Sequence, residues 1–196
     1  MHTLNDPWLQ RWLPALATAA NGGPVLEIGC GAGDDTLVLV RAGLSVVAFD
    51  RSPDAVATTI ASAPAATVSV HDVRDLFPLE GAGIGAVVAS LSLHYFPWNQ
   101  TVTIVERIRG TLRVGGLLLA RFNATDDVNF GASGHPEIER GLYSANGKPK
   151  RFFAEDDVLA LFGSGWRHLS LQHRVSFKYH KPKALWEVLV ERLDNT

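Results

Sequence analysis

Short apolar runs and helix-like segments alternate along most of the chain, beginning at Pro24. A short apolar run bounded by glycine or polar residues is typical of a buried strand, whereas apolar positions that recur with a helical period indicate a helix. The predicted strands are 25–28, 44–49, 67–70, 84–93, 117–122, 169–177 and 185–190. The predicted helices are 34–42, the segment from Ser52 to just before Pro64, 101–112 and 155–162. Such alternation is typical of a parallel sheet with helices on both faces.

The carboxyl-terminal part departs from this alternation. Residues 123–151 are polar and glycine-rich with no sustained period, so they predict a long excursion after the fifth strand. Long segments of this kind are usually functional or disordered, and we expect a substrate lid there. The last two strands, joined by residues 180–183, predict an antiparallel hairpin at the sheet edge. The alternative is a C-terminal helix from Pro182.

The amino-terminal residues 1–23 are expected to form a helical cap that closes the domain or covers a site. Four apolar side chains there fall at helical spacing: Trp8, Leu9, Trp12 and Leu13. The length of 196 residues fits one domain over 1–196. Residues 1–10 carry no basic apolar stretch, so we expect no secretion signal.

Composition narrows the range of partners. A formal net charge of -2 makes a broad basic surface for nucleic-acid phosphates unexpected. The single cysteine, Cys30, excludes an internal disulfide and favours a reducing, cytoplasmic setting. The most apolar segment, 84–93, is far shorter than the ~20 residues that span a bilayer, so no membrane partner is expected. The sequence contains no Cys/His spacing typical of a metal site, and it leaves the oligomeric state open.

The segment with the clearest chemical content is Glu27-Ile28-Gly29-Cys30-Gly31-Ala32-Gly33, between a predicted strand and a predicted helix. Glycine at such a turn lets the backbone approach a ligand closely. A dinucleotide fingerprint needs its third glycine at position 34, where this chain has Asp34 followed by Asp35. Two carboxylates at a helix N-terminus oppose a pyrophosphate. A nucleoside that carries a positive group meets no such repulsion.

On these residues the sequence resembles the class I methyltransferases that use S-adenosylmethionine, and the resemblance covers nearly the whole chain. It implies an α/β fold with a Rossmann-like, doubly wound, seven-stranded sheet, mostly parallel with an antiparallel C-terminal hairpin strand. In the family an acid at the end of strand two binds both ribose hydroxyls, which matches Asp50. An acid after strand three holds the adenine amino group, which matches Asp72, and Val73 would offer its backbone to the ring.

The resemblance also extends to the fourth and fifth strands. Residues 89–96 look like the family's strand-four edge, which faces the methyl group and the acceptor. Arg113-Val114-Gly115-Gly116 looks like the family's turn before strand five, with Val114 in place of proline. The residues we expect to bind S-adenosylmethionine are Glu27, Gly29, Cys30, Gly31, Gly33, Asp50, Arg51, Asp72, Val73, Ser90 and Leu91.

Acceptor binding and catalysis are assigned to residues near the strand-four edge. His94 is the best candidate base, because its charge changes near neutral pH. Tyr95 is the second predicted catalytic residue. The alternative for His94 is a hydrogen-bonded histidine at the edge of the cleft with no catalytic role. The residues expected to contact the acceptor are Trp98, Arg121, Asn123 and Arg151. The two arginines would favour an anionic acceptor if they point into the cleft. We expect Cys30 to pack beside the glycine turn.

The sequence therefore predicts direct, in-line methyl transfer to a small-molecule acceptor, with a general base optional. Two other functions stay open. A non-catalytic nucleoside-binding or regulatory domain would keep the fold without an acceptor site. An NAD-dependent oxidoreductase would share the architecture, although Asp34 speaks against it.

Overall fold

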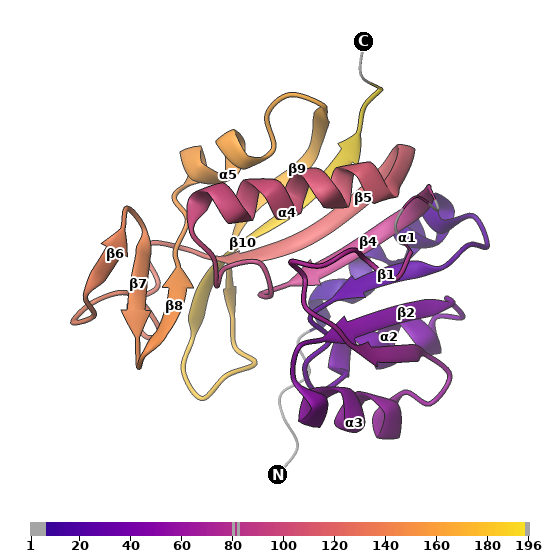
Figure 1. Ribbon diagram of the computed structural model, residues 1–196, viewed down its shortest axis with the longest axis horizontal. Helices are drawn as coiled ribbons and strands as arrows, with labels where there is room; N and C mark the ends of the chain where they lie inside the picture. Colours follow the sequence, from indigo (N-terminus) through magenta and orange to yellow (C-terminus); the bar gives the residue numbers. More distant parts are fainter. Residues whose placement is uncertain (1–6, 80, 82, 195–196) are drawn as a thin grey trace.

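The computed structural model describes residues 7–79, 81 and 83–194. Its main sheet has seven strands in the order β3-β2-β1-β4-β5-β10-β9 (Figure 1). Their bounds are β1 Val25–Ile28, β2 Val46–Asp50, β3 Thr67–Val70, β4 Ile84–Ser90, β5 Leu112–Asn123, β9 Trp166–Ser176 and β10 Lys183–Arg192. Neighbouring strands run parallel from β3 to β5, and β10 is antiparallel to both β5 and β9. The predicted fold class is confirmed.

Helices cover both faces of this sheet. They are η1 Pro7–Trp12 (a 3-10 helix), α1 Leu13–Ala20, α2 Asp34–Arg41, α3 Pro53–Ser62, α4 Trp98–Thr111 and α5 Glu155–Leu161. Successive strand residues point to opposite faces. Leu26 and Val87 therefore join the core that includes α4 and α5, whereas Val25 and Ala86 join the core under η1, α1 and α2. In Figure 1, α4 lies in front of the sheet, with α1 and α2 behind it.

The strand order creates a crevice at one edge of the sheet. The chain runs from β1 outward through β2 to β3, then crosses to β4 on the other side of β1. At such a reversal the loops after neighbouring strands diverge, and ligands of open α/β sheets bind there, beyond the carboxyl ends of the strands. Asp50 ends β2 and Ser90 ends β4, so both lie at this edge.

Several predicted boundaries shift. The fourth strand ends at Ser90 rather than at residue 93, because Leu91 adopts a left-handed conformation with φ of 53°. The predicted helix 101–112 begins earlier, at Trp98, and ends at Thr111. Gly115 and Gly116, predicted to form a turn between this helix and the next strand, lie inside β5 instead. The pairing of β5 with β4 shifts register there.

The carboxyl-terminal hairpin is confirmed, with one correction to its place. β10 lies between β5 and β9, so of the two hairpin strands only β9 is an edge strand of the sheet. The alternative of a helix from Pro182 is wrong, since β10 begins at Lys183 and pairs along its length with β9.

The segment 123–151 also differs from its prediction as irregular chain. Asn123 belongs to β5, and the rest contains a second, three-stranded sheet formed by β6 Glu137–Glu139, β7 Leu142–Ala145 and β8 Lys148–Arg151. These strands are short, and of their residues only Leu142 and Arg151 are buried. They therefore show no apolar alternation in the sequence. Antiparallel backbone pairing joins β6 to β7 and β7 to β8.

The described part of the amino-terminal segment forms two short helices, η1 and α1. Residues 1–6 of the predicted helical cap lie outside the described residues. Trp8, Leu9 and Leu16 are buried against the sheet. None of the helices in the described part of the chain is both long and apolar enough to cross a membrane.

Candidate functional site

A cavity of about 640 Å³ lies at the carboxyl edge of the parallel strands. Loops that follow β1, β2, β3 and β4 form most of its wall, and β8 of the small sheet closes it. The residues that line this first cavity are Ile28, Gly29, Gly31, Phe49, Asp50, Arg51, Ser52, His71, Asp72, Val73, Ser90, Leu91, Ser92, Tyr95, Phe96, Lys148 and Pro149. The volume falls in the range of small-molecule sites.

Asp50 provides a first carboxylate to the first cavity. One carboxylate oxygen accepts the backbone N–H of Gly31 at 3.0 Å, and the other accepts the N–H of Ser52 at 2.9 Å. The side chain thus connects the loop of residues 29–33, the glycine loop, to the start of α3. Ser52 in turn caps α3, since its hydroxyl accepts the N–H of Ala55 at 3.3 Å. The carboxylate is fixed in place, and each of its oxygens keeps a second lone pair for a ligand.

Gly29 and Gly31 serve different purposes in the loop. Gly29 has φ of 75°, and a Cβ there would lie 2.4 Å from the Cβ of Ser92, so this glycine permits the loop after β1 to pack on the loop after β4. Gly31 has φ of 56°, and a Cβ there would meet nothing within 4 Å. Because Gly31 also lines the first cavity, its backbone is open to a ligand.

Asp72 provides a second carboxylate to the first cavity. Arg74 donates to it through the backbone N–H at 2.9 Å and through the guanidinium at 2.9 and 2.6 Å. These hydrogen bonds from Arg74 lower the pKa of Asp72 to about 2. The carboxyl is therefore ionised across the physiological pH range. Val73 and the His71 ring complete this part of the wall, where His71 packs edge-on against Phe49.

Three of the predicted cofactor residues lie behind the wall instead of lining it. Glu27 is 3% exposed and accepts a hydrogen bond from the Thr36 hydroxyl at 2.6 Å; burial raises the pKa of Glu27 to about 8. Cys30 packs beside the glycine turn as expected, and burial raises the pKa of its thiol to about 11. Gly33 contacts α3, where a Cβ would lie 2.7 Å from the Ser62 hydroxyl. The other eight predicted cofactor residues line the cavity.

The two predicted catalytic residues occupy different environments. Tyr95 lines the first cavity, and burial raises the pKa of its phenol, which keeps it neutral. His94 is 4% exposed, lies outside the cavity lining and stacks at 4.1 Å between ring centroids on Tyr95. The pKa of His94 lies well below its usual value. Burial is the largest cause, and the positive charges of Lys150 and Lys183 lower the pKa further. The imidazole is therefore neutral.

The four predicted acceptor residues do not line the first cavity, and three of them connect the small sheet to the main one. The Arg151 guanidinium pairs with Glu139 and donates to the carbonyl oxygens of Phe96 at 3.1 Å and Arg140 at 3.0 Å. It also lies 5.6 Å from the ring centroid of Trp98. The Asn123 amide donates to the Arg151 carbonyl at 3.1 Å.

Arg121 forms a comparable link to the amino-terminal segment. Its guanidinium lies 3.9 Å from the ring centroid of Trp8 and donates to the Ser90 hydroxyl at 2.9 Å. Asp35 is 4.0 Å away and accepts the Trp8 indole N–H at 2.9 Å. Arg121 thereby fixes η1 against β4 and α2.

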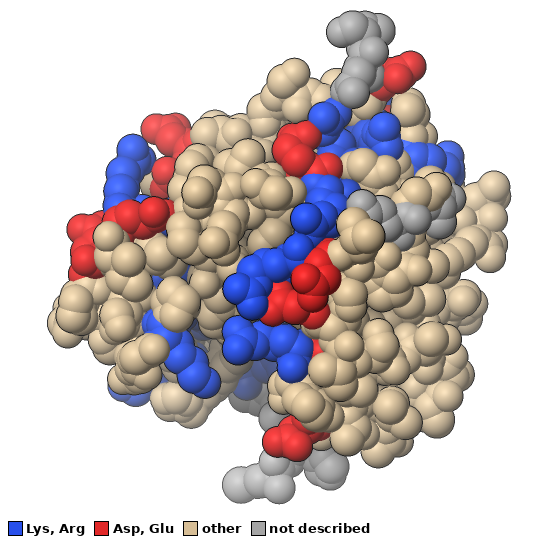
Figure 2. All heavy atoms as spheres, in the orientation of Figure 1, with Lys and Arg blue, Asp and Glu red and all other residues tan. Residues whose placement is uncertain are grey.

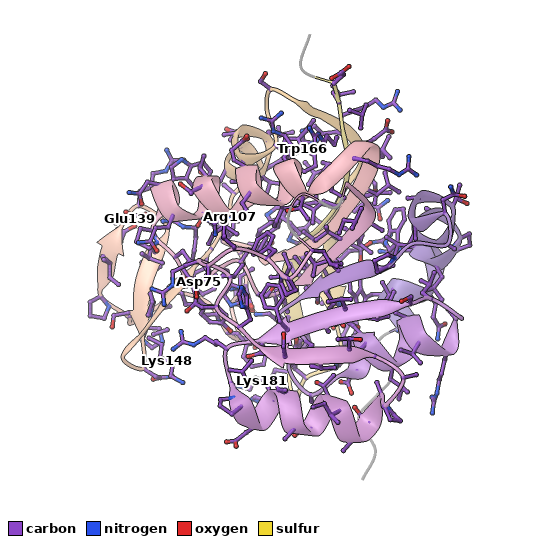
Figure 3. The ribbon with its side chains drawn as sticks, turned by 45° about the vertical axis from the view of Figure 1, so that its right-hand side comes forward. Asp75, Arg107, Glu139, Lys148, Trp166 and Lys181 are labelled. Carbon is purple, nitrogen blue, oxygen red and sulfur yellow. The ribbon has the colours of Figure 1, made fainter. Side chains whose placement is uncertain are left out.

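A second cavity, of about 450 Å³, adjoins the first. It lies between β8 and the segment that precedes the small sheet, and the two cavities share Tyr95, Lys148 and Pro149. Its lining residues are Tyr95, Val128, Asn129, Phe130, Gly131, Ser133, His135, Ala145, Asn146, Lys148, Pro149 and Lys150. Figure 3 shows Lys148 at one end of the small sheet and Glu139 at the other.

Sequence reasoning missed part of both cavities. Phe49, His71 and Ser92 adjoin predicted strand ends, so their position in the chain is a signal that could have found them. Lys148 and Pro149 carry no such signal, because the strand that presents them lies in a segment without a periodic pattern.

Comparison with known proteins agrees with this geometry. Residues 25–116 match a family described as a methyltransferase domain. An uncharacterized methyltransferase of Mycobacterium bovis is 32% identical over 120 residues, which are 61% of this chain and 44% of that protein. The chain therefore corresponds to less than half the length of that relative.

Solved structures share the fold. A SAM-dependent methyltransferase from Methanosarcina mazei superposes with a TM-score of 0.73 at 14% identity, covering 88% of this chain and 93% of its own. The 1,6-didemethyltoxoflavin-N1-methyltransferase of Burkholderia thailandensis, solved with 1,6-didemethyltoxoflavin and S-adenosylhomocysteine, has a TM-score of 0.71 at 16% identity and covers 97% and 80%. At these identities the likeness concerns the fold alone.

Proposed function

We propose that this protein is a class I S-adenosylmethionine-dependent methyltransferase, which binds S-adenosylmethionine in the first cavity and methylates a small-molecule acceptor. The match of residues 25–116 to a methyltransferase domain supports this proposal. The observation that carries the proposal is the Asp50 carboxylate, fixed by two backbone N–H groups beside the open backbone of Gly31. This arrangement suits a ribose diol, which donates two hydrogen bonds, on a nucleoside that approaches the glycine loop closely.

The residues of the first cavity match the parts of the cofactor. Asp50 would accept from the ribose hydroxyls, and Asp72, held as a carboxylate by Arg74, would accept from the adenine amino group. Each hydrogen bond to a charged group contributes about 1.5–3 kcal/mol. When bound, the cofactor supplies an activated methyl group on a positively charged sulfur. Glu27 lies behind the loop and contributes through its contact with Thr36 on α2.

Positioning of the acceptor is the main task of the remaining residues. Correct alignment of reacting groups contributes about 7–11 kcal/mol to lowering a barrier. Tyr95 lines both cavities and would contact the acceptor, and its ring face can attract a cation by ~0.5–2 kcal/mol. His94 is neutral and stacked behind Tyr95, so we assign it the role of holding Tyr95 in place. An acceptor with a lone pair needs no general base.

The amino-terminal end of α2 argues against the dinucleotide alternative. Asp34 pairs with Lys178 at 2.6 Å, and Asp35 accepts the Trp8 indole N–H. Both carboxylates are thus held at the helix end where a pyrophosphate would need uncovered N–H groups.

As part of the same proposal, residues 1–196 form one domain in which 1–23 is a cap and 123–151 a substrate lid, and the protein acts in the cytoplasm.

Calorimetry on the native protein tests the cofactor assignment. We expect S-adenosylmethionine and S-adenosylhomocysteine to bind with one site each, and NAD to give no heat of binding. Failure of both sulfur nucleosides to bind would overturn the proposal, and binding of NAD in their place would favour the oxidoreductase.

A turnover assay separates an enzyme from a non-catalytic binding domain. Formation of S-adenosylhomocysteine is followed with a panel of small molecules that offer N, O or S nucleophiles. We expect turnover with at least one class of acceptor. Cofactor binding without turnover across the panel would favour the regulatory domain.

A further inference from the structure

The second cavity has the properties of a site for a negatively charged group. Its lining includes Lys148 and Lys150, and of its described lining residues none is Asp or Glu. We propose that Lys148 and Lys150 bind a carboxylate or phosphate group of the methyl acceptor, and so select anionic acceptors. This inference rests on the proposed function, because it takes the first cavity as the source of the methyl group.

The position of the two lysines in β8 places them together. Residues two apart in a strand point to the same side, so the side chains of Lys148 and Lys150 both face the second cavity. Lys148 also lines the first cavity, and Tyr95 lies between the two. An acceptor whose anionic group contacts the lysines would therefore extend its other end toward Tyr95 and the first cavity.

The direct contacts of the Lys150 ammonium with described residues are to uncharged groups. This ammonium group donates to the Phe130 carbonyl at 2.8 Å and lies 5.0 Å from the Phe152 ring centroid. Across the described part of the chain, neither Lys148 nor Lys150 has a carboxylate as an ion-pair partner. An ammonium group carries three donors, so Lys150 retains capacity for a ligand.

Lys183, in contrast to Lys150, forms an ion pair with a carboxylate of the fold. Its ammonium lies 3.2 Å from Asp127, whose other oxygen accepts the N–H groups of Asn129 and Phe130. Asp127 is thus engaged within the fold. Burial and the nearby charge of Lys183 lower the pKa of Lys150 to about 8, and the attraction of the Asp127 carboxylate offsets part of this effect.

Lys148 lies at the lower end of the small sheet and Glu139 at its upper end (Figure 3). In Figure 2 basic side chains lie toward the lower end, whereas acidic and basic side chains lie together at the upper end. Glu139 is already paired with Arg151. Lys148 and Lys150 are the charged side chains that an anion would meet in the second cavity.

Three matched fragments provide the test: benzoate, phenyl phosphate and the neutral analogue benzamide. Their binding is measured by ligand-observed NMR, with and without S-adenosylhomocysteine. We expect the native protein to bind at least one anionic fragment more tightly than benzamide. In the double variant Lys148→Gln/Lys150→Gln, that affinity should fall about tenfold, the loss expected for one charge-assisted contact. The stronger of the two anions identifies the group that the site accepts.

Control variants distinguish the cavity lysines from general surface charge. Lys181 is exposed and lines neither cavity, so Lys181→Gln should bind the fragments as the native protein does. The double variant Lys148→Arg/Lys150→Arg keeps both positive charges, so it should bind the anions that the double glutamine variant loses. It should keep this affinity at about pH 9, whereas the native protein loses affinity as the pH rises past about 8.

The outcomes separate this inference from the proposed function. If S-adenosylhomocysteine binds but the anions bind no better than benzamide, or bind equally to the double glutamine variant, the lysine site is wrong and the cofactor site stands. If S-adenosylhomocysteine fails to bind while the lysine-dependent anion binding persists, the proposed function is wrong and the anion site stands.

Discussion

The two cavities meet at Tyr95, Lys148 and Pro149, yet they are built in different ways. The first lies on the ends of buried parallel strands and presents the carboxylates of Asp50 and Asp72. The second is formed mostly by one polar insertion and presents lysines. Strand topology thus sets the place of the first cavity, whereas the insertion sets the chemistry of the second. One fold can keep the cofactor side constant while insertions change the acceptor.

The largest expected effect concerns the carboxylate at the end of β2. Asp50→Ala should weaken binding of S-adenosylhomocysteine by about 100-fold or more, because two hydrogen bonds to a charged group are lost. Anion binding in the second cavity should change little, since Asp50 does not line it. Calorimetry and the fragment titrations measure the two effects on the same sample.

A matched acid provides the control for this substitution. Asp54 is exposed in the first turn of α3 and lines neither cavity. Asp54→Ala should therefore bind the nucleoside as the native protein does. Because Asp50 also holds two backbone N–H groups, circular dichroism must show that the variant is folded. Unchanged affinity in a folded Asp50→Ala protein would refute the ribose assignment.

The glycine loop permits a comparison of folding with binding. Gly29→Ala should lower the free energy of unfolding by about 2–4 kcal/mol, because the new methyl meets Ser92 and the backbone keeps a left-handed conformation. Gly31→Ala has room for its methyl, so it should cost only about 1–2 kcal/mol for the conformation. Its methyl enters the first cavity, and nucleoside affinity should fall while the fold is kept. Urea denaturation and calorimetry separate the two; equal losses of stability would contradict the distinction.

The sequence predicted the first cavity better than the second, for a physical reason. Strands buried on both faces need continuous apolar runs, which makes strand ends visible, and ligands bind at those ends. The family resemblance assigned Asp50, Asp72 and Val73 at or after the ends of predicted strands two and three, and all three line the cavity. Boundaries were less accurate where the backbone turns locally, as at Leu91.

The small sheet could not be predicted in the same way. Its strands have three or four residues, and only Leu142 and Arg151 among them are buried, so no apolar pattern marks the strands in the sequence. The charged residues of the segment were correspondingly ambiguous. Arg151 was expected to bind the acceptor, but its guanidinium is engaged with Glu139 and two carbonyl oxygens. The lysines that do line the second cavity were not singled out.

The attachment of the small sheet should be sensitive to Arg151. Arg151→Gln leaves buried carbonyl oxygens with fewer donors and removes the partner of Glu139, so we expect a loss of about 2–3 kcal/mol in stability. Anion binding should fall with it, whereas nucleoside binding should be largely kept. Thermal unfolding and both titrations give the result.

Arg140→Gln is the control for that substitution. Arg140 is 86% exposed on its side chain and pairs with Asp157 at 3.2 Å, a surface ion pair of about 0–1 kcal/mol. Its loss should change neither stability nor binding measurably. If Arg151→Gln and Arg140→Gln behaved alike, the buried arginine would not be what attaches the small sheet.

The effect that is smallest per pH unit is a pH dependence of stability that originates behind the first cavity. Glu27 has a pKa of about 8 in the folded protein and 4.5 as a free group. Below about pH 4.5 both states hold the proton. Between the two values only the folded state holds it, so stability falls as the pH rises, by at most about 1.4 kcal/mol per pH unit. Above about pH 8 this contribution is constant.

Glu27→Gln removes the titrating group and keeps an oxygen that accepts from Thr36. The variant should gain stability relative to the native protein as the pH rises from about 5 to about 8, as urea titrations at several pH values can show. An identical pH profile in the two proteins would mean that Glu27 titrates normally. A flatter profile in the variant would show that the cofactor side keeps one buried neutral acid beside the charged acids at its surface.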